Sequence, residues 1–300
     1  MKKSALLLLS LALLMLFSYR TFAQVNSPDL RVATLDWTVA ETLLALGQPP
    51  IAVGDAESYR TWVSVPELPQ HTLDLGTRLQ PNQELLAKLQ PDRFINSAMF
   101  SNLTPILQHY ARQHAGQSQP VNEVNFYREG EIWQNQLAAT RELAQLIAKP
   151  QRAESLIQQT EQLFVQLKTQ LTPYQNRTLL LVQFIDSRHL RVYGENSLFG
   201  AAIRQMGFRN AWTAPVTLWG STNIGINQLA EFKDNPRLIV IKPYPLNVPT
   251  ALEHNTLWQH LPLSKDPLVL PAIWTFGALP SAQRFALALA DALQQGGEPW

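Results

Sequence analysis

The stretch Pro150–Tyr174, "PQRAESLIQQTEQLFVQLKTQLTPY", limits how the rest of the chain can be arranged. Its apolar residues recur at a spacing that keeps them on one side of an α-helix: Leu156, Ile157, Leu163, Phe164, Leu167 and Leu171. Pro150 is suited to the first turn of a helix, and Pro173 ends the pattern. The stretch therefore predicts one amphipathic helix of roughly 30 Å, because each helical residue adds about 1.5 Å.

Strands and helices alternate on both sides of this helix. Before it, strands are expected in "LRVATLDW", "IAVGD", "HTLDLG" and "RFINSA", with helices in "TVAETLLALG" and in "NQELLAKLQPD" after Asn82. After it, "RTLLLVQFID", "HLRVYG", "LIVIKP" and "PLVLP" predict strands, and "SLFGAAIRQMG" and "PSAQRFALALADALQQGG" predict helices. We expect two α/β lobes, residues 24–149 and 174–300, joined by a rigid helix over residues 150–173. The ligand cleft is expected between the lobes, where loops follow the carboxyl ends of the strands.

The first 23 residues have the pattern of a cleavable signal peptide. Lys2 and Lys3 precede an apolar run over residues 5–17, and small residues at Thr21 and Ala23 predict cleavage before Gln24. This run is too short to span a bilayer comfortably, which takes about 20 residues. We therefore expect an exported protein. The chain has no cysteine, so the exported protein would depend on its core without disulfides.

The charge balance argues against a nucleic-acid partner. Without Lys2, Lys3 and Arg20 of the leader, 21 basic and 23 acidic residues remain, a net of −2. A nucleic-acid-binding protein would show a clustered basic excess instead. The eight tryptophans are more informative, because Trp is enriched in pockets and interfaces as well as in cores.

No catalytic or metal-ligating group emerges from the sequence. Without cysteine there is no thiol nucleophile, no hydrolase or phosphate-binding motif appears, and the histidines lack the spacing of metal ligands. Asp186 and His189 leave open a secreted hydrolase, but a turn between two strands explains Asp186 equally well. The sequence thus predicts a binding protein with no catalytic residues and no cofactor.

Aromatic residues gather instead in the loops that follow predicted strands. They are Tyr59 and Trp62, Phe100, Trp212 and Trp219, and Trp274 and Phe276. Arg78, in "LDLGTRLQPN", is the strong cationic donor among them. Apolar walls with a few fixed polar groups are typical of small-molecule sites. A surface ion pair of Arg78 with Glu84 or Asp74 is the alternative.

Several of these stretches together resemble one known family. They are "WTVAETLLALGQPPIAVGDAESYRTWVSVPELP", "DLGTRLQPNQELLAKLQPD", "NSLFGAAIRQMGFRNAW", "LWGST" and "PAIWTFGA". In order and over nearly all of the chain after the leader, they are similar to the periplasmic ferric-hydroxamate (ferrichrome-type) siderophore-binding proteins of bacterial ABC importers. The resemblance implies two α/β lobes on one long helix and delivery of the ligand to an inner-membrane permease. We expect a monomer.

The resemblance also implies roles for individual residues. Arg78 matches the arginine that donates to the iron-bound hydroxamate oxygens, and Phe100 falls where the family usually has a tyrosine. Other positions match the lining of the family's pocket: Trp37, Trp62, Trp212, Trp219, Ser221 and Trp274, with Tyr59 in the same loops. Asn96 replaces a tryptophan found in close relatives. Both departures, Asn96 and Phe100, affect which siderophore is preferred.

For docking on the permease, Glu84 matches the acidic position on the first lobe. On the second lobe, Asn227 or Gln228 stands where an acid is expected, and Glu231 is the nearest candidate. A ferric tris-hydroxamate fills all six positions around iron, so the protein need not supply a metal ligand. The same fold could instead carry a catecholate siderophore, cobalamin or haem. A triply negative catecholate would require several cations, and haem an axial His or Tyr.

Overall fold

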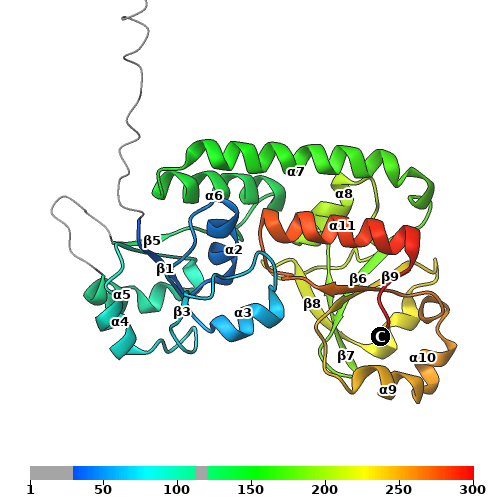
Figure 1. Ribbon diagram of the computed structural model, residues 1–300. Helices are drawn as coiled ribbons and strands as arrows, with labels where there is room; N and C mark the ends of the chain where they lie inside the picture. The colour runs from blue at the N-terminus through cyan, green and yellow to red at the C-terminus, as the bar shows by residue number, and fades with distance from the viewer. Residues whose placement is uncertain (1–29, 112–119) are drawn as a thin grey trace, which may run out of the picture. The chain divides into compact units, whose positions relative to one another are not determined.

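The computed structural model describes residues 30–111 and 120–300, so the predicted signal peptide lies outside the described part of the chain. Residues 31–300 form a single compact unit with two five-stranded sheets. Helix α7 (Pro150–Gln170) runs past both sheets (Figure 1). The predicted fold class, two α/β lobes joined by one long helix, is confirmed.

The first sheet is entirely parallel, in the order β3-β2-β1-β4-β5. Its strands are β1 (Val32–Thr34), β2 (Ala52–Val53), β3 (Leu73–Asp74), β4 (Arg93–Asn96) and β5 (Val121–Glu123). The helices between and after them are α2 (Trp37–Ala45), α3 (Ala56–Trp62), α4 (Gln83–Leu89), α5 (Thr104–Tyr110) and α6 (Ile132–Leu146). Asn82 caps α4 as expected, because its side chain accepts from the amides of Glu84 and Leu85. Parallel order brings the carboxyl ends of all these strands to one edge.

The second sheet is mixed, in the order β10-β9-β6-β7-β8. Its strands are β6 (Leu179–Phe184), β7 (His189–Tyr193), β8 (Ser221–Gly225), β9 (Arg237–Lys242) and β10 (Leu268–Ala272). Strand β7 is antiparallel to both β6 and β8, and the other pairs are parallel. The accompanying helices are α8 (Leu198–Gln205), α9 (Val248–Glu253), α10 (Thr256–His260) and α11 (Leu279–Gln295). Ser197 caps α8 by accepting from the Gly200 amide, as the sequence predicts.

Two features differ from the sequence prediction. The segment after β2, expected to be a loop, contains α3, in which Tyr59 is completely buried and Trp62 is the last residue. No helix or strand is predicted between β4 and α7, where the structure contains η1 (Ala98–Leu103), α5, β5 and α6. The helices α3 and α5 carry too little periodicity to be read from sequence, since seven residues make only two turns. This reason does not apply to α6, which has 15 residues.

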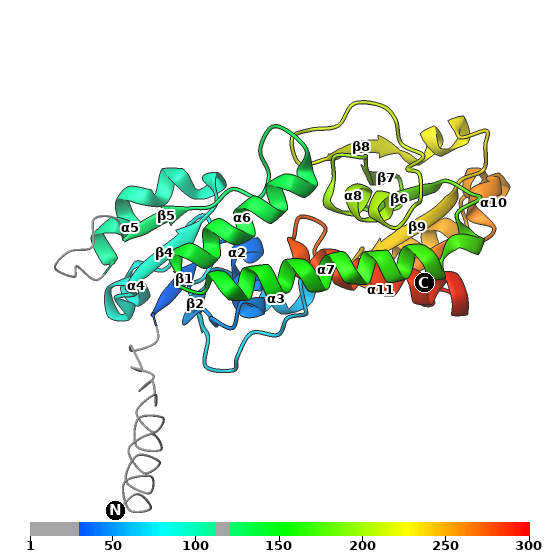
Figure 2. The same ribbon diagram turned by 90° about the horizontal axis from the view of Figure 1, so that it is seen from above.

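Helix α7 buries the predicted stripe, with Leu156, Ile157, Phe164 and Leu167 inside and Leu163 at its edge. It packs against α6 of the first half and against α8 and α11 of the second half (Figure 2). A helix of 21 residues is about 31 Å long, enough to contact both halves without a break. The helix therefore acts as a continuous support for both sheets.

A second connection between the halves is a buried carboxyl group. Glu41 on α2 accepts hydrogen bonds from the backbone amide of Ala278 and from Ser281 Oγ at 2.6 Å, at the beginning of α11. Gly277 lets the two segments approach, because a Cβ atom there would lie 2.5 Å from the Glu41 carboxylate. Burial raises the pKa of Glu41 from its usual 4.5 to about 7, against the opposing effect of these hydrogen bonds.

This raised pKa predicts a stability that depends on pH. Between pH 4.5 and 7 the native state keeps the Glu41 proton that the unfolded chain has already released. The stability that this proton contributes is therefore complete below pH 4.5 and is lost as pH rises through 7. In Glu41→Gln the amide mimics the protonated carboxyl, so the loss disappears. We expect urea unfolding of the wild type to lose on the order of 3 kcal/mol between pH 5 and 8 relative to the variant. Glu161→Gln, on the exposed side of α7, is the control; equal pH slopes in wild type and Glu41→Gln would contradict the prediction.

Candidate functional site

The loops after β1, β2, β3 and β4 each contribute a side chain to one pocket. These side chains are Asp36, Asp55, Arg78 and Met99. They converge because four parallel strands end at the same edge of the first sheet. Trp37 and Thr38 at the start of α2, and Ser58 and Trp62 on α3, complete this half of the lining.

The second half of the chain supplies the facing wall by a different route. Trp274 and Phe276 follow β10, as the open-sheet rule predicts, but Arg191 lies within β7 and Trp219 precedes β8. Trp219 is held by a tight turn: Gly220 has a positive φ of 74°, and a Cβ atom there would lie 2.3 Å from the Ser197 Cα. Strand ends therefore explain the first wall and the Trp274 and Phe276 part of the second, whereas Arg191 and Trp219 depend on the antiparallel β7–β8 pair.

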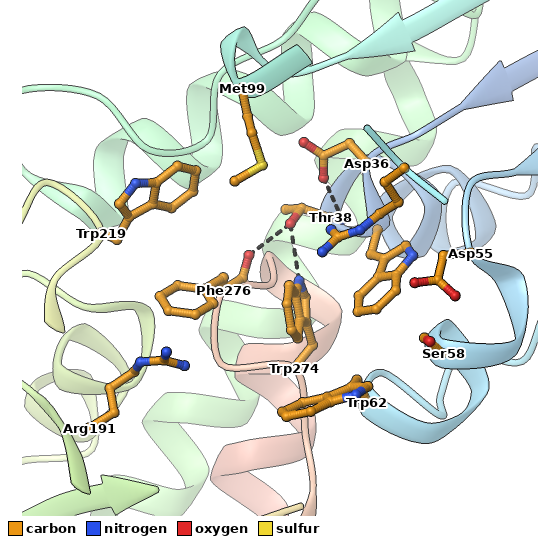
Figure 3. A pocket seen from close by; sticks show the side chains of 12 residues that line it. Asp36, Thr38, Asp55, Ser58, Trp62, Met99, Arg191, Trp219, Trp274 and Phe276 are labelled. Atoms are coloured by element: carbon orange, nitrogen blue, oxygen red, sulfur yellow. Dashed lines mark hydrogen bonds between the residues drawn. The ribbon is translucent and has the colours of Figure 1, made fainter. Parts of the chain in front are cut away.

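Together these residues enclose a cavity of about 470 Å³ (Figure 3). Its base is the seam between α2 and the loop after β10. Thr38 Oγ1 donates to the Phe276 carbonyl at 2.7 Å, and Trp274 Nε1 donates to Thr38 Oγ1 at 3.3 Å. The Trp274 ring also packs edge-on against Trp37, with centroids 5.1 Å apart. Such a base holds the aromatic side chains in fixed orientations.

Arg78 has no ion pair within 4.0 Å among the described residues. Its guanidinium carbon lies 3.9 Å from the centroid of the Trp37 ring, whose Nε1 is fixed by a 2.9 Å bond to the Gly54 carbonyl. Asp74 instead accepts from the backbone amides of Ala56 and Gly76, so it is engaged elsewhere. Partial burial lowers the pKa of Arg78, with Asp36 and Asp55 opposing that effect. The ion-pair alternative for Arg78 therefore does not hold, and its donors are available to a ligand.

Four side chains expected at the pocket lie elsewhere. Phe100 is 2% exposed, packs in the core of the first sheet and borders a separate hollow beside α5. Tyr59 is completely buried, with its hydroxyl donating to the Pro66 carbonyl. Trp212 packs against the core of the second sheet, and Ser221 is buried at the start of β8. In each case the side chain packs within its own lobe, which the local sequence does not reveal.

Asn96, the other departure from the resembled family, is also outside this cavity. Its Oδ1 accepts from the Leu35 amide at 2.6 Å and from Thr34 Oγ1 at 3.2 Å, which ties β4 to β1. It borders the separate hollow beside α5.

Sequence reasoning missed several residues that the lining contains. Met99, rather than Phe100, reaches the cavity and is half exposed. Arg191 was overlooked because it lies within a predicted strand and not in a loop. Alternation could have identified it: Leu190 and Val192 are completely buried on one side of β7, which places residue 191 on the other. Asp36 and Asp55 follow strands β1 and β2, but they resemble ordinary helix-capping residues.

The predicted docking residues both lie at the surface. Glu84 is in the first turn of α4 and is exposed. Glu231 is the last residue of the short helix η3 (Ile226–Glu231) and is also exposed. Gln228 accepts from the Gly225 amide, so its side chain has a local structural role.

Metal binding, catalysis by Asp186 and His189, and membrane insertion find little support in the described parts of the chain. No group of three or more His, Asp or Glu side chains there could hold a metal ion. The Asp186 carboxylate forms a 2.9 Å hydrogen bond with His189 Nδ1 and accepts from the backbone amides of Arg188 and His189. These hydrogen bonds close an exposed hairpin away from the pocket. The hydrogen bond from His189 lowers the pKa of Asp186. None of the helices in residues 30–111 and 120–300 combines the length and hydropathy of a membrane span.

Comparison with known proteins identifies the class. A family model of periplasmic binding proteins matches residues 32–265, and the chain belongs to this family. The iron(3+)-hydroxamate-binding protein FhuD of Escherichia coli (strain K12) is 33% identical over 265 residues, which cover 88% of this chain and 86% of that protein.

Solved structures share the fold. The Fe3+-Desferal-bound FhuD of Vibrio cholerae has a TM-score of 0.81 at 24% identity, over 90% of this chain and all of that one. The triscatecholate siderophore-binding protein FeuA of Bacillus subtilis has a TM-score of 0.64 at 18% identity, over 88% of this chain and 92% of that one. Because chains of this fold are described with different chelates, the fold alone does not determine the ligand.

The separation of Phe100 from Met99 can be tested directly. Phe100→Leu replaces one core residue with another of similar size, so we expect about 1 kcal/mol of lost stability and an unchanged dissociation constant for any ligand of the cavity. Met99→Ala should have the opposite pattern, with weaker binding and little change in unfolding. Urea unfolding and tryptophan-fluorescence titration of both variants measure this. Weakened binding in Phe100→Leu, with Met99→Ala unaffected, would contradict the placement.

Proposed function

We propose that this protein captures ferric hydroxamate siderophores in the periplasm and delivers them to an inner-membrane ABC permease. The observation that carries the proposal is an unpaired arginine, Arg78, set over a tryptophan in an aromatic-walled cavity between two lobes. The 33% identity to a hydroxamate-binding protein supports the same ligand class. The protein acts as a binding protein, not as an enzyme.

The chemistry of such a ligand suits this cavity. Six hydroxamate oxygens complete the coordination of iron, so the protein needs hydrogen-bond donors and apolar surface rather than metal ligands. A guanidinium offers paired donors to adjacent electron-rich oxygens and keeps its charge. The rings of Trp37, Trp62, Trp219 and Trp274 contact the ligand body with little loss of rotamer freedom. In this proposal the ferric complex is cargo, and the protein has no cofactor of its own.

The alternatives are less well supported by the same lining. Haem would require an axial His or Tyr, and the lining of the 470 Å³ cavity includes neither. A hydrolase based on Asp186 and His189 would have its catalytic pair on an exposed hairpin outside the cavity. A catecholate or another chelate remains the second candidate, because FeuA shares the fold.

The Arg78 role predicts a loss of affinity. In Arg78→Ala the ligand oxygens lose a charged donor while remaining buried, which costs about 1.5–3 kcal/mol and weakens binding roughly tenfold or more. Quenching of the pocket tryptophans during titration with a ferric trihydroxamate measures it. Arg60→Ala is the matched control, since Arg60 is exposed on α3 and outside the lining. Unchanged affinity in Arg78→Ala would contradict the role, and quenching only by a catecholate or cobalamin would replace the ligand class.

Delivery predicts a separable effect of the surface glutamates. We propose that Glu84 and Glu231 pair with basic residues of the permease. We expect Glu84→Lys to reduce stimulation of the importer's ATPase in proteoliposomes several-fold, with ligand affinity unchanged, because rim charges chiefly affect docking. Glu231→Lys tests the second lobe, and Glu161→Lys on α7 is the control. Full stimulation by both lobe variants would exclude these residues from docking.

The proposed assembly is a monomer that works with small lobe movements. The continuous α7 and the α2–α11 seam both connect the halves, so a large rotation would have to break the Glu41 and Thr38 hydrogen bonds.

A further inference from the structure

The cavity has a second arginine that the proposed ligand class leaves unexplained. Arg191 reaches the lining from β7, on the wall opposite Arg78 (Figure 3 shows it beyond Phe276). Its guanidinium carbon lies 5.2 Å from the centroid of the Phe276 ring. No carboxylate of the described residues lies within 4.0 Å of it.

The charges of the two walls differ. On the first wall, Arg78 is accompanied by two carboxylates, Asp36 and Asp55. Among the second-wall residues that line the cavity, Arg191 is accompanied by Trp219, Trp274 and Phe276, which are all uncharged. The cavity therefore has positive charge without a counter-ion on the second wall.

The strand that carries Arg191 gives it a firm base. Leu190 and Val192 are fully buried in the core of the second sheet, and β7 pairs with strands on both sides. On the side of Arg191, Tyr193 is completely buried and its hydroxyl donates to Gln183 at 3.0 Å. Burial raises the pKa of Tyr193 to about 12, and hydrogen bonding with Thr275 together with the charge and hydrogen bonding of Arg191 oppose that rise. The guanidinium thus projects from a rigid strand into the cavity.

A neutral ligand would leave this cation poorly compensated. Filling the cavity removes water from Arg191, and a desolvated charge without a counter-ion is costly even where a neutral hydroxyl lies beside it. A ferric trihydroxamate has no net charge at its iron centre, and Arg78 already provides a donor for the hydroxamate oxygens. A carboxylate elsewhere on the ligand would accept the paired donors of Arg191 and neutralise it.

We propose, resting on the siderophore function above, that Arg191 is a specificity-determining residue that selects ferric hydroxamates bearing an additional anionic group, such as a carboxylate arm. Arg78 then contacts the hydroxamate centre from the first lobe, and Arg191 contacts the arm from the second. The first lobe thus recognises the iron-bound hydroxamates, and the second lobe recognises the charge of the ligand arm.

A charge series on one chelate tests this. The ferric complex of the linear trihydroxamate desferrioxamine B carries a pendant amine; acetylation removes that charge, and succinylation replaces it with a carboxylate. Tryptophan quenching with the three complexes compares ligands that differ in the arm and share the iron centre. We expect the wild type to bind the succinylated complex at least about tenfold more tightly than the acetylated one, a preference that falls with added salt.

Variants separate charge recognition from general packing. Arg191→Gln should reduce the preference for the succinylated over the acetylated complex to within about threefold, and this ratio of dissociation constants is the readout. Arg191→Lys keeps the charge without the planar fork and should retain part of the preference. Arg188→Gln is the matched control, because Arg188 is an exposed residue of the same hairpin outside the lining. Thermal unfolding by circular dichroism checks that every variant is folded.

The outcomes are distinguishable. Equal affinity of the wild type for the acetylated and succinylated complexes would overturn the inference and leave the siderophore function intact. A preference that survives in Arg191→Gln would assign it to another group and also overturn the inference. Equal weakening of all three complexes in Arg191→Gln would make Arg191 a hydroxamate contact instead. Quenching by none of the complexes would overturn the proposed hydroxamate ligand class, on which this inference rests.

Discussion

A buried carboxyl group on α2 holds the first turn of α11, and the geometry of the ligand cavity depends on that contact. Glu41 accepts from Ala278 and Ser281, and one helical turn earlier Thr38 donates to the carbonyl of Phe276. The loop between β10 and α11 is therefore fastened to the first lobe. Since Trp274 and Phe276 lie in that loop, the same bonds that join the lobes also orient the aromatic base of the cavity.

Burial of this carboxyl group shifts its pKa. Burial favours the protonated form, and the hydrogen bonds from Ser281 and Ala278 favour the carboxylate. The result is a group whose pKa of about 7 lies close to neutral pH. Apolar packing between α2 and α11 would not depend on pH, but it would not fix the loop with directional hydrogen bonds.

The two walls of the cavity have separate structural origins and separate chemistry. The first is a product of parallel topology, which sets Asp36, Asp55, Arg78 and Met99 at one sheet edge. The second combines the loop after β10, which carries Trp274 and Phe276, with the antiparallel β7–β8 pair, which presents Arg191 and Trp219. The lining contributed by β7 can therefore change while the lining contributed by the first sheet is retained. That is consistent with a fold whose known members are described with different chelates.

The sequence by itself determined the long helix, most of the strands and the class of site. The periodicity from Leu156 to Leu171 is local, and so are the caps at Asn82 and Ser197, because each depends on residues within a turn or two. Arg78 was also identifiable as a candidate, since it follows a predicted strand among loops that carry aromatic residues, but only the structure shows that Asp74 is engaged by backbone amides. Only the tertiary structure decided that Phe100, Tyr59 and Trp212 turn inward while Met99 and Arg191 face the cavity. An aromatic ring in a loop buries its surface equally well in a core or in a pocket, so its direction is fixed by contacts with distant residues, which the local sequence does not contain.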